Sequence, residues 1–403
     1  MRWFQENTVN FLLSRPLKLG YDSAMGSCPS IRVPFGRPSI EDADIDAVVD
    51  VLRSGWIAYG PHVDRFESRL AEWVGSSAAV TLNSCTTALE SVLRCSGIGG
   101  EVVVPSFTWV AVANAVINAG ARPVFADTDD RTYNVTPASI RECISPQTEA
   151  IIVPHYGGQM ADIEGIAELC RKRGLLLIED CAETMGGKRK GVLAGSTGVG
   201  CFSFYPTKAI TTAMGGAVVC DDQQLIDRIR MDATHGLCSS PPVDGTPHRP
   251  WERAAVMPGR NLRMPNLLAA LGLVQLERLD ELNEYRRSAA CKYDEALSGI
   301  ESISIPHVAC DAFHVYQMYS VRVHGGQRDA VLRRLWAMGI SANTHFDPPI
   351  HAQPWYAEST FGGAALPNTE LLRREILTVP IFPSITDDEI SATATAIVEA
   401  LET

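Results

Sequence analysis

The stretch AIIVPHYGGQMADIEGIAELCRKRGLLLIED, residues 150–180, holds the pattern that decides the fold. Two short apolar runs, at 150–154 and 175–180, flank a segment with helical character at 162–173. The apolar runs are continuous rather than alternating, which is typical of strands that are buried on both faces. A strand, a helix and a second strand in this order predict a βαβ unit of a parallel sheet.

Similar runs occur on both sides of this unit. Five of them predict further strands: AAVTL (78–82), EVVVP (101–105), RPVFAD (122–127), GCFSFY (200–205) and GAVVC (216–220). Ahead of them, PHVDRFESRLAEW (61–73) has apolar residues at helical spacing, and Gly75 follows it as a helix end. The sequence therefore predicts an α/β fold with a mostly parallel sheet that helices cover on both faces.

The pattern changes after residue 265. A long helical stretch covers 267–297, and a strand at 319–323, a helix near 327–338 and a terminal helix from Asp387 follow it. The first 30 residues show no regular pattern. We therefore predict an N-terminal extension (1–30), a large domain (31–265) and a smaller α+β C-terminal domain (266–403).

Composition argues against several classes of function. The 403 residues carry a net charge of −12 without a basic cluster, which disfavours nucleic acid or an anionic membrane as a partner. No apolar run reaches the ~18 residues of a membrane span, and residues 1–30 lack the apolar core of a secretion signal. The eleven cysteines form no C-x-x-C and the nine histidines no H-E-x-x-H, so we expect no metal site, and we interpret His307 and His314 near Cys310 as chance placement. Free thiols favour the cytoplasm.

A lysine follows one of the predicted strands in CFSFYPTKAITTAMGG, residues 201–216. An amine that leaves a buried strand can be shielded from water, and shielding favours the neutral form that attacks carbonyl groups. Lys208 is therefore a candidate nucleophile. Taken alone the signal is weak, because most lysines after strands extend to solvent.

Three more features lie at predicted strand ends. Asp180 ends LLLIED at the edge of the sheet where ligands bind, and it could pair with a protonated pyridine nitrogen or simply cap the next turn. NSCTTALESVLRCSG (83–97) opens a helix whose free N–H groups could hold a phosphate, or the motif could be a plain cap. Trp109 could stack on an aromatic cofactor or pack in the core.

Seven motifs in order carry a resemblance to a known family. They are SGWIAYGP (54–61), NSCTTAL (83–89), EVVVPSFTWVAVANAV (101–116), HYGGQMADI (155–163), IEDCAE (178–183), SFYPTK (203–208) and GRNLRMPNLLAALGLVQLERLD (259–280). With these the chain resembles the sugar aminotransferases of the DegT type, which depend on pyridoxal phosphate and have fold type I. The resemblance runs from about residue 31 to the C-terminus and includes LPNTELLRREILTVPIFPSITDDEI (366–390).

The resemblance implies a role for each matching residue around the cofactor ring. Lys208 would attach the cofactor covalently and then move the proton between substrate carbon and cofactor. Asp180 would hold the pyridine nitrogen, and Trp109 would stack on the ring. Glu183 would lie beside the 3-hydroxyl group, where Gln or His is more common in the family.

The resemblance also implies a phosphate site and a shared dimer. The phosphate would be bound by Thr86, Thr87 and Ser203. Asn261 and Arg263 would reach into the neighbouring subunit's site, so a homodimer with shared active sites is expected. Two segments depart from the family pattern near the substrate, Ala58-Tyr59 and 212–216 (TAMGG).

These implications lead to a predicted function. Lys208 stands where the dehydratase branch of the family has His, which favours amino transfer. We predict transfer from glutamate or glutamine to a nucleotide-linked keto-deoxysugar. The alternatives are a keto-cyclitol acceptor of the scyllo-inosose type and a non-catalytic regulator with the same fold; a nicotinamide enzyme lacks the expected G-x-G-x-x-G. The predicted contacts for a substrate diphosphate are basic: Arg32, Arg37, Lys188, Arg189, Arg249 and Arg260.

Overall fold

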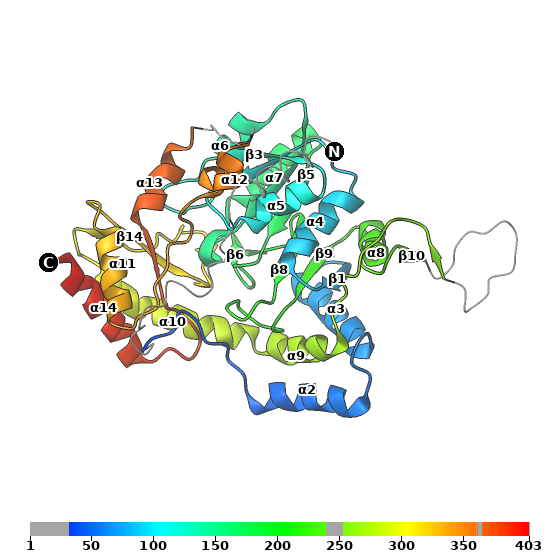
Figure 1. Ribbon diagram of the computed structural model, residues 1–403, viewed down its shortest axis with the longest axis horizontal. Coiled ribbons are helices and arrows are strands. Elements are labelled where there is room, and N and C mark those ends of the chain that lie inside the picture. Colours follow the sequence, from blue (N-terminus) through cyan, green and yellow to red (C-terminus); the bar gives the residue numbers. More distant parts are fainter. Residues whose placement is uncertain (1–31, 239–252, 360, 362–364, 403) are drawn as a thin grey trace, which may run out of the picture.

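Seven strands form the central sheet of the computed structural model, which describes residues 32–238, 253–359, 361 and 365–402 (Figure 1). The predicted extension (1–30) and Arg249 lie outside the described residues. In spatial order the strands are β1 (Ala78–Leu82), β9 (Gly216–Cys220), β8 (Val199–Ser203), β5 (Leu176–Asp180), β4 (Thr148–Pro154), β2 (Glu101–Pro105) and β3 (Arg122–Ala126). The seven runs between residues 78 and 220 that the sequence marked as strands are strands of this sheet.

The sheet is mostly parallel, as predicted, with one reversed strand. The pairs β8–β5, β5–β4, β4–β2 and β2–β3 are parallel, while β9 runs antiparallel to both β8 and β1. Residues 204–215 between β8 and β9 contain no helix. A parallel crossover usually contains a helix and this connection has none, so the chain turns back here instead.

Helices cover both faces of this sheet. The described helices of eight or more residues are α2 (Asp42–Ser54), α3 (Pro61–Val74), α4 (Cys85–Cys95), α5 (Ala111–Asn118), α7 (Ile163–Arg173), α8 (Gln223–Asp232), α9 (Asn266–Glu277), α10 (Leu279–Leu297), α11 (Arg328–Ala337), α13 (Pro367–Glu375) and α14 (Asp387–Leu401). The shorter ones are α6 (Pro137–Cys143), α12 (Pro354–Ala357), η1 (Tyr156–Gly158) and η2 (Ile350–Ala352).

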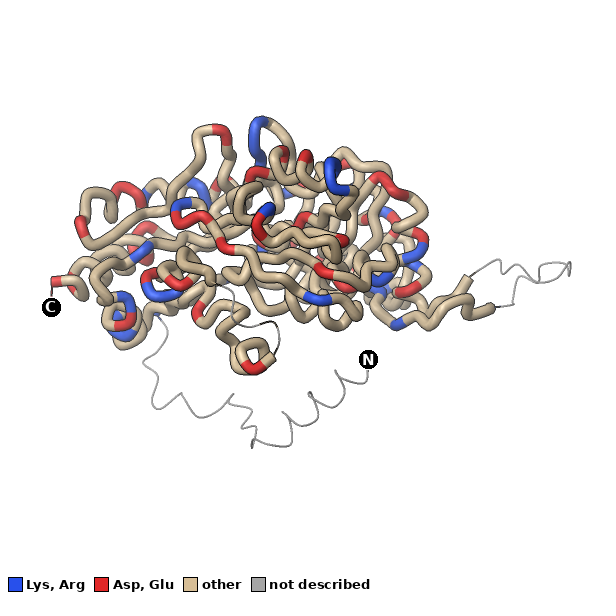
Figure 2. Tube along the Cα trace, turned by 90° about the horizontal axis from the view of Figure 1, so that it is seen from above, with Lys and Arg blue, Asp and Glu red and all other residues tan. Residues whose placement is uncertain are grey.

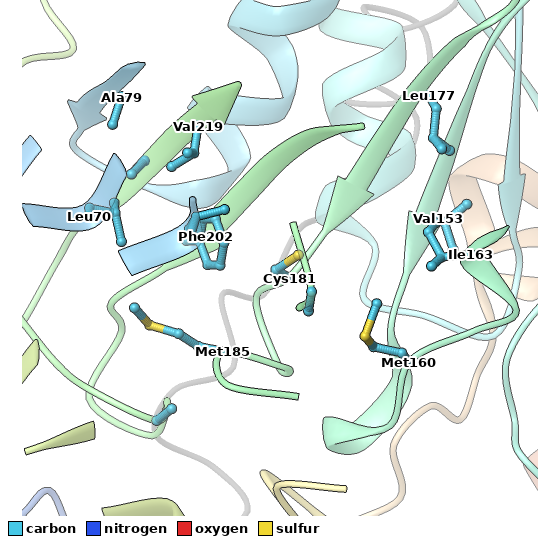
Figure 3. Close-up of a cluster of buried hydrophobic side chains, with 14 of the residues drawn as sticks. Leu70, Ala79, Val153, Met160, Ile163, Leu177, Cys181, Met185, Phe202 and Val219 are labelled. Atoms are coloured by element: carbon cyan, nitrogen blue, oxygen red, sulfur yellow. The ribbon is translucent and has the colours of Figure 1, made fainter. Parts of the chain in front are cut away.

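Alternate side chains of each strand enter two different cores. On one face, Val219 of β9 lies near Leu70 of α3 at one end of a core, and Ile163 of α7 lies beside Val153 of β4 at the other end (Figure 3). Val218, the neighbour of Val219, packs with Leu89 of α4 on the other face, together with residues of α5 and α8. Burial on both faces is the reason that the strand sequences are continuously apolar.

The C-terminal part of the chain has its own small sheet and core. Its strands are β12 (Ile303–Ser304), β14 (Tyr319–Val323) and β15 (Ile376–Val379). Residues of this sheet pack with α10, α11 and α14, and Val33 from the start of the described chain joins them. Short strands β6 (Lys188–Arg189), β7 (Val192–Leu193) and β13 (Ala312–Phe313) form a further sheet, and β10 (Leu237–Cys238) pairs with β11 (Ala254–Ala255).

The long helix predicted over 267–297 is two helices. The chain leaves helical geometry at Arg278, whose guanidinium binds Asp44 of α2 at 3.2 Å. Gly272 of α9 lies against Phe66 of α3, so α9 packs under the large sheet. α10 then runs towards α11 and α14 (Figure 1). The predicted domain boundary at 265/266 stays a proposal.

Two further features of the structure concern the distribution of charged residues and the apolar character of the helices. Basic and acidic residues are interspersed along the described chain, as Figure 2 shows. Among the described residues, no helix combines the length and the apolar character that crossing a membrane requires.

Candidate active site

A cavity of about 510 Å³ opens at the carboxyl ends of the parallel strands. The last residues of four strands line it: Pro105 of β2, Pro154 of β4, Asp180 of β5 and Ser203 of β8. Carboxyl ends of parallel strands meet at one edge of a sheet, which is the usual place for a ligand in α/β folds. The predicted residues Thr86, Trp109, Glu183 and Lys208 also line this cavity, and with His155 the fold brings together residues from five separate motifs.

Lys208 lies in the turn that follows β8. Its backbone N–H donates to the Tyr205 carbonyl at 2.9 Å, and its side chain is 18% exposed. The amine Nζ lies 3.7 Å from Oε1 of Glu183. The other carboxylate oxygen of Glu183 accepts the N–H of Gly157 at 3.0 Å, which fixes the acid beside the amine. The alternative that Lys208 simply extends to solvent is wrong.

Asp180 is a buried carboxylate, and no cationic side chain of the described residues forms an ion pair with it. Its Oδ1 accepts the N–H of Ala182 at 3.1 Å and lies 3.7 Å from the thiol of Cys85. Burial, and secondarily the charge of Glu183, raise the pKa of Asp180 against the opposing hydrogen bond. The bond to Ala182 is the local cap expected as an alternative, but the carboxylate retains acceptor capacity towards the cavity.

The start of α4 forms the wall next to Asp180. Ser84 is its N-cap and accepts the Thr87 N–H at 3.2 Å. Thr86 lines the cavity, whereas the hydroxyl of Thr87 lies 2.8 Å from Oδ1 of Asn83, within its own turn. A side chain at Gly216 would come within 2.3 Å of Ser84, so only glycine lets β9 pass this close to the helix start. Free N–H groups at a helix start bind anions.

The mouth of the cavity is aromatic. Trp109 lines it and is 60% exposed, so the alternative that it packs in the core is wrong. Its ring centroid lies 6.3 Å from that of Phe346. Tyr205 and Met214 also line the cavity with exposed side chains. A stacking surface for a planar or sugar ring is therefore present.

Asn261 and Arg263 do not line the cavity of their own chain. Both are exposed, and Nε of Arg263 donates to Oδ1 of Asn261 at 3.3 Å. Arg263 pairs with Leu82 at the end of β1 in an isolated bridge, close to the start of α4. This outward placement agrees with a role in a neighbouring subunit and leaves that role a proposal.

A buried histidine under the cavity was missed at the level of sequence. Nε2 of His155 lies 3.0 Å from Oε2 of Glu179, and its Nδ1 accepts the Ala161 N–H at 3.2 Å. Burial alone would raise the pKa of Glu179, but His155 and backbone N–H groups outweigh it and lower the pKa. Cys181 joins these two in a cluster of metal-ligand types, yet the donor atoms are already hydrogen-bonded, which argues against a metal. His155 is the first residue of the motif HYGGQMADI and directly follows β4, and this position was the sequence signal that could have identified it.

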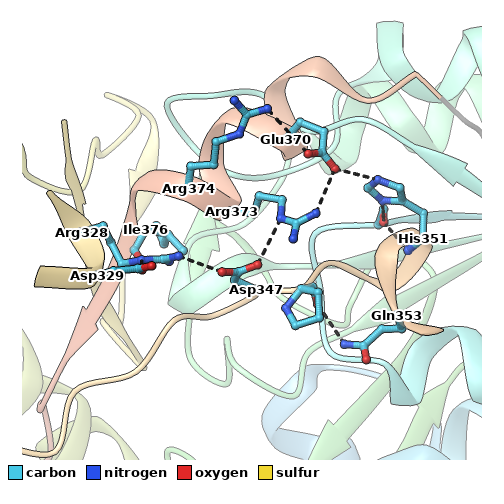
Figure 4. Close-up of polar contacts among 11 residues, drawn as sticks. Arg328, Asp329, Asp347, His351, Gln353, Glu370, Arg373, Arg374 and Ile376 are labelled. Carbon is cyan, nitrogen blue, oxygen red and sulfur yellow. Dashed lines mark hydrogen bonds and ion pairs between the residues drawn. The ribbon is translucent and has the colours of Figure 1, made fainter. Parts of the chain in front are cut away.

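A loop from the C-terminal part closes one side of the cavity with His345 and Phe346. Ion pairs hold it in place: Asp347 binds Arg328 at 2.8 Å and Arg373 at 3.1 Å (Figure 4). Burial lowers the pKa of His345 to about 4. No local sequence signal marks this loop, because its place depends on partners elsewhere in the chain.

The predicted diphosphate contacts are not supported. None of the five described residues of that set lines the cavity. Arg260 binds Asp232 at 2.5 Å and also Glu90, Arg189 binds Asp311 at 3.2 Å, and Arg37 binds Glu389 at 3.4 Å. An arginine already paired in this way has little capacity left for a ligand, so the interpretation of Arg260 as a substrate contact is wrong.

The model of the DegT/DnrJ/EryC1/StrS aminotransferase family matches residues 38–398. The chain belongs to this family. Among family relatives, the spore coat polysaccharide biosynthesis protein SpsC of Bacillus subtilis is 35% identical over 89% of this chain and 94% of its own. The aminotransferase TlmJ of Streptoalloteichus hindustanus has a TM-score of 0.86 at 33% identity, covering 92% of this chain and 99% of its own. DesV of S. venezuelae was solved in complex with a ketimine intermediate. It has a TM-score of 0.83 at 32% identity, covering 93% of this chain and 100% of its own.

This DegT-type chain is therefore a sugar aminotransferase of fold type I that depends on pyridoxal phosphate. Solved relatives include pyridoxal-phosphate and pyridoxamine-phosphate forms. The cavity fits this cofactor: an amine, a buried carboxylate short of a cation and a helix start with free N–H groups face one space. These are the groups that an aldehyde, a protonated pyridine and a phosphate require.

Proposed function

We propose that this sugar aminotransferase transfers the amino group of glutamate to a nucleotide-linked keto-deoxysugar. The observation that carries the proposal is the division of the cavity. Its floor has the ionisable groups of Lys208, Asp180 and Glu183, while its mouth is formed by uncharged rings such as Trp109 and Tyr205. Chemistry at a carbonyl group needs ionisable groups such as those of the floor. The flat rings of the mouth offer a surface on which a sugar ring can pack.

Each residue of the floor has a proposed task. The bound cofactor supplies an aldehyde that can carry an amino group and a ring that withdraws electrons. Lys208 attaches the cofactor and moves a proton to and from the reacting carbon, and Glu183 orients its amine. Asp180 keeps a proton on the pyridine nitrogen. Thr86 and Ser203 bind the phosphate at the start of α4. The predicted contact of Thr87 requires its hydroxyl to leave Asn83, because its backbone N–H is already bound by Ser84.

A second copy of the chain is proposed to complete the site. The substrate's phosphates need cations, and no arginine among the described residues lines the cavity of a single chain. Arg263 of the partner subunit is proposed to supply a cation, and it and Asn261 of the partner subunit are proposed to contact the cofactor bound in this site. The exposed side chains of Trp56, Ile57 and Tyr59 offer apolar area for a homodimer. We propose the cytoplasm as its location, where free thiols stay reduced.

Mixed dimers test the shared site. A Lys208→Ala protein and an Asn261→Ala/Arg263→Ala protein are each expected to be inactive alone. After they are unfolded together and reassembled, random pairing gives hybrids with one intact site, so roughly a quarter of wild-type activity is expected. The measurement is turnover of the mixture against each parent. Confirmed hybrids that remain inactive, or a wild-type protein that sediments as a monomer, would contradict the shared site.

An acceptor panel tests the proposed substrate. We expect transfer from glutamate to a 4-keto or 3-keto nucleotide sugar with KM at least ~10-fold lower than for the same keto sugar without its nucleotide, since each lost charge-assisted contact costs about 1.5–3 kcal/mol. Turnover of a keto-inositol without activity on any nucleotide sugar would favour the cyclitol alternative. Purified protein that stays colourless with added pyridoxal phosphate would favour the non-catalytic regulator.

A further inference from the structure

Arg286 of α10 is a buried guanidinium with no acid beside it. Its side chain is 3% exposed, and among the residues that the structure describes no Asp or Glu pairs with it. Burial lowers the pKa of Arg286 to about 10, which leaves it charged at neutral pH. Burying a charge without a counter-ion is costly, and an apolar side chain of similar volume is often as stable or more so. Stability therefore gives no reason for a charge at this place.

The contacts of this guanidinium point to the active site. Nη1 donates to the carbonyl of Leu282, one turn earlier in the same helix, at 3.3 Å. Nη2 donates to the carbonyl of Lys208 at 2.9 Å, and Nε has no partner. The contact of Arg286 outside its own helix is thus made to the backbone of the lysine whose amine faces the cavity.

A second buried side chain binds the preceding peptide. Gln317, which is 7% exposed, donates from Nε2 to the carbonyl of Thr207. Arg286 and Gln317 come from different segments of the C-terminal part, and both Thr207 and Lys208 line the cavity. Two consecutive carbonyl groups are therefore held by side chains of the C-terminal part.

We propose that Arg286 and Gln317 are positioning residues for Lys208, a clamp on two carbonyl groups that sets the direction in which the amine leaves the backbone. The proposal rests on the proposed role of Lys208. Fixing consecutive carbonyls fixes the peptide planes on which the Lys208 side chain is built. A shift of about 1 Å in a reacting group can cost 10²-fold in rate, so such a clamp has a large effect without touching the substrate.

Arg287, the next residue, provides a matched control. It also donates to a backbone carbonyl, that of His314 at 2.8 Å, and it lies 4.1 Å from the centroid of the Phe313 ring. Its contacts do not involve the turn of Lys208. Arg287→Met therefore removes an equal charge and an equal type of hydrogen bond from the same helix, away from the lysine.

The experiment compares Arg286→Met, Arg286→Gln, Gln317→Leu and Arg287→Met as holoenzymes. For Arg286→Met we expect kcat to fall by about 10²-fold with little change in KM and a small loss of melting temperature, because the carbonyl of Lys208 loses this donor. Arg286→Gln keeps a donor without the charge, so a smaller fall is expected. Arg287→Met should retain kcat within about 2-fold.

A spectroscopic reading separates positioning from general stability. The pH titration of the bound cofactor's absorbance reports protonation of the nitrogen that it shares with the lysine. Glu183 lies 3.7 Å from the lysine amine, and the titratable groups of Asp180, Cys85 and His345 line the same cavity; all four stay unchanged in all variants. Loss of a nearby positive charge favours the protonated form, so the midpoint should rise by about one unit in Arg286→Met and stay put in Arg287→Met.

A cofactor-free reading completes the test. Reductive methylation of the apoprotein, followed by peptide mass spectrometry, should show a changed rate at Lys208 in Arg286→Met and Gln317→Leu. If the titration midpoint, the methylation rate and kcat are all unchanged in Arg286→Met, the clamp is overturned. If Arg286→Met does not fold, Arg286→Gln and Gln317→Leu decide. Borohydride reduction of the wild-type holoenzyme that marks a different lysine would instead overturn the proposed role of Lys208.

Discussion

Lys208→Ala is expected to lose the visible absorbance of the covalently bound cofactor and to lose turnover by on the order of 10⁴-fold, the upper range for removing a general acid–base group. The amine is the only lysine nitrogen among the described residues that line the cavity, so no neighbour can replace it. The fold should be retained, because the side chain is partly exposed and its ion pair with Glu183 is long at 3.7 Å.

The control for this variant is a lysine of similar chemistry away from the cavity. Lys190 is exposed and pairs with Glu164 at 2.7 Å, and such surface pairs contribute little. Lys190→Ala should therefore keep both the absorbance and the rate. A Lys208→Ala protein that retains wild-type turnover would refute the assignment of the lysine.

The strands and the floor of the site could be predicted from local sequence. A strand buried on both faces must be apolar along its length, and polar residues that directly follow it must lie at the sheet edge. Asp180 and Ser203 end β5 and β8, and both face the cavity. The reversed direction of β9 was not visible in its own residues, since it depends on the short connection before it.

The parts that the sequence did not disclose depend on distant partners. From the sequence, Arg260 is predicted to be a free cation, but in the structure it forms ion pairs with Asp232 and Glu90. His345 reaches the cavity through a loop held by Arg373 and Arg328 on two other elements. Arg286 looks like any charged residue of an amphipathic helix until its carbonyl partner is known. A pattern within a segment reports burial and spacing, but it does not report which remote group a side chain meets.

Asp180→Asn is expected to lower kcat by about 10²-fold or more, the scale of removing one preorganised electrostatic contact. A neutral amide cannot hold a proton on the pyridine nitrogen, so the ring withdraws electrons less strongly. The measurement is kcat with saturating cofactor. Asp311→Asn, at a surface acid that pairs with Arg189 at 3.2 Å, is the control and should be unaffected. An unchanged kcat in Asp180→Asn would show that another group holds the nitrogen.

Asp180→Asn is also expected to raise the melting temperature of the cofactor-free protein, although it lowers kcat. Because the pKa of Asp180 is raised in the folded protein, the folded state binds this proton more tightly than the unfolded chain does. The stability that this gives is present below the unfolded pKa and is lost as the pH rises through the folded pKa, so at neutral pH the buried charge destabilises the cofactor-free protein. Asp180→Asn should therefore melt above the wild type without cofactor and gain less than the wild type when pyridoxal phosphate is added. A wild type that melts higher in both states would mean that the carboxylate is stabilised by the protein itself rather than by the cofactor's cation.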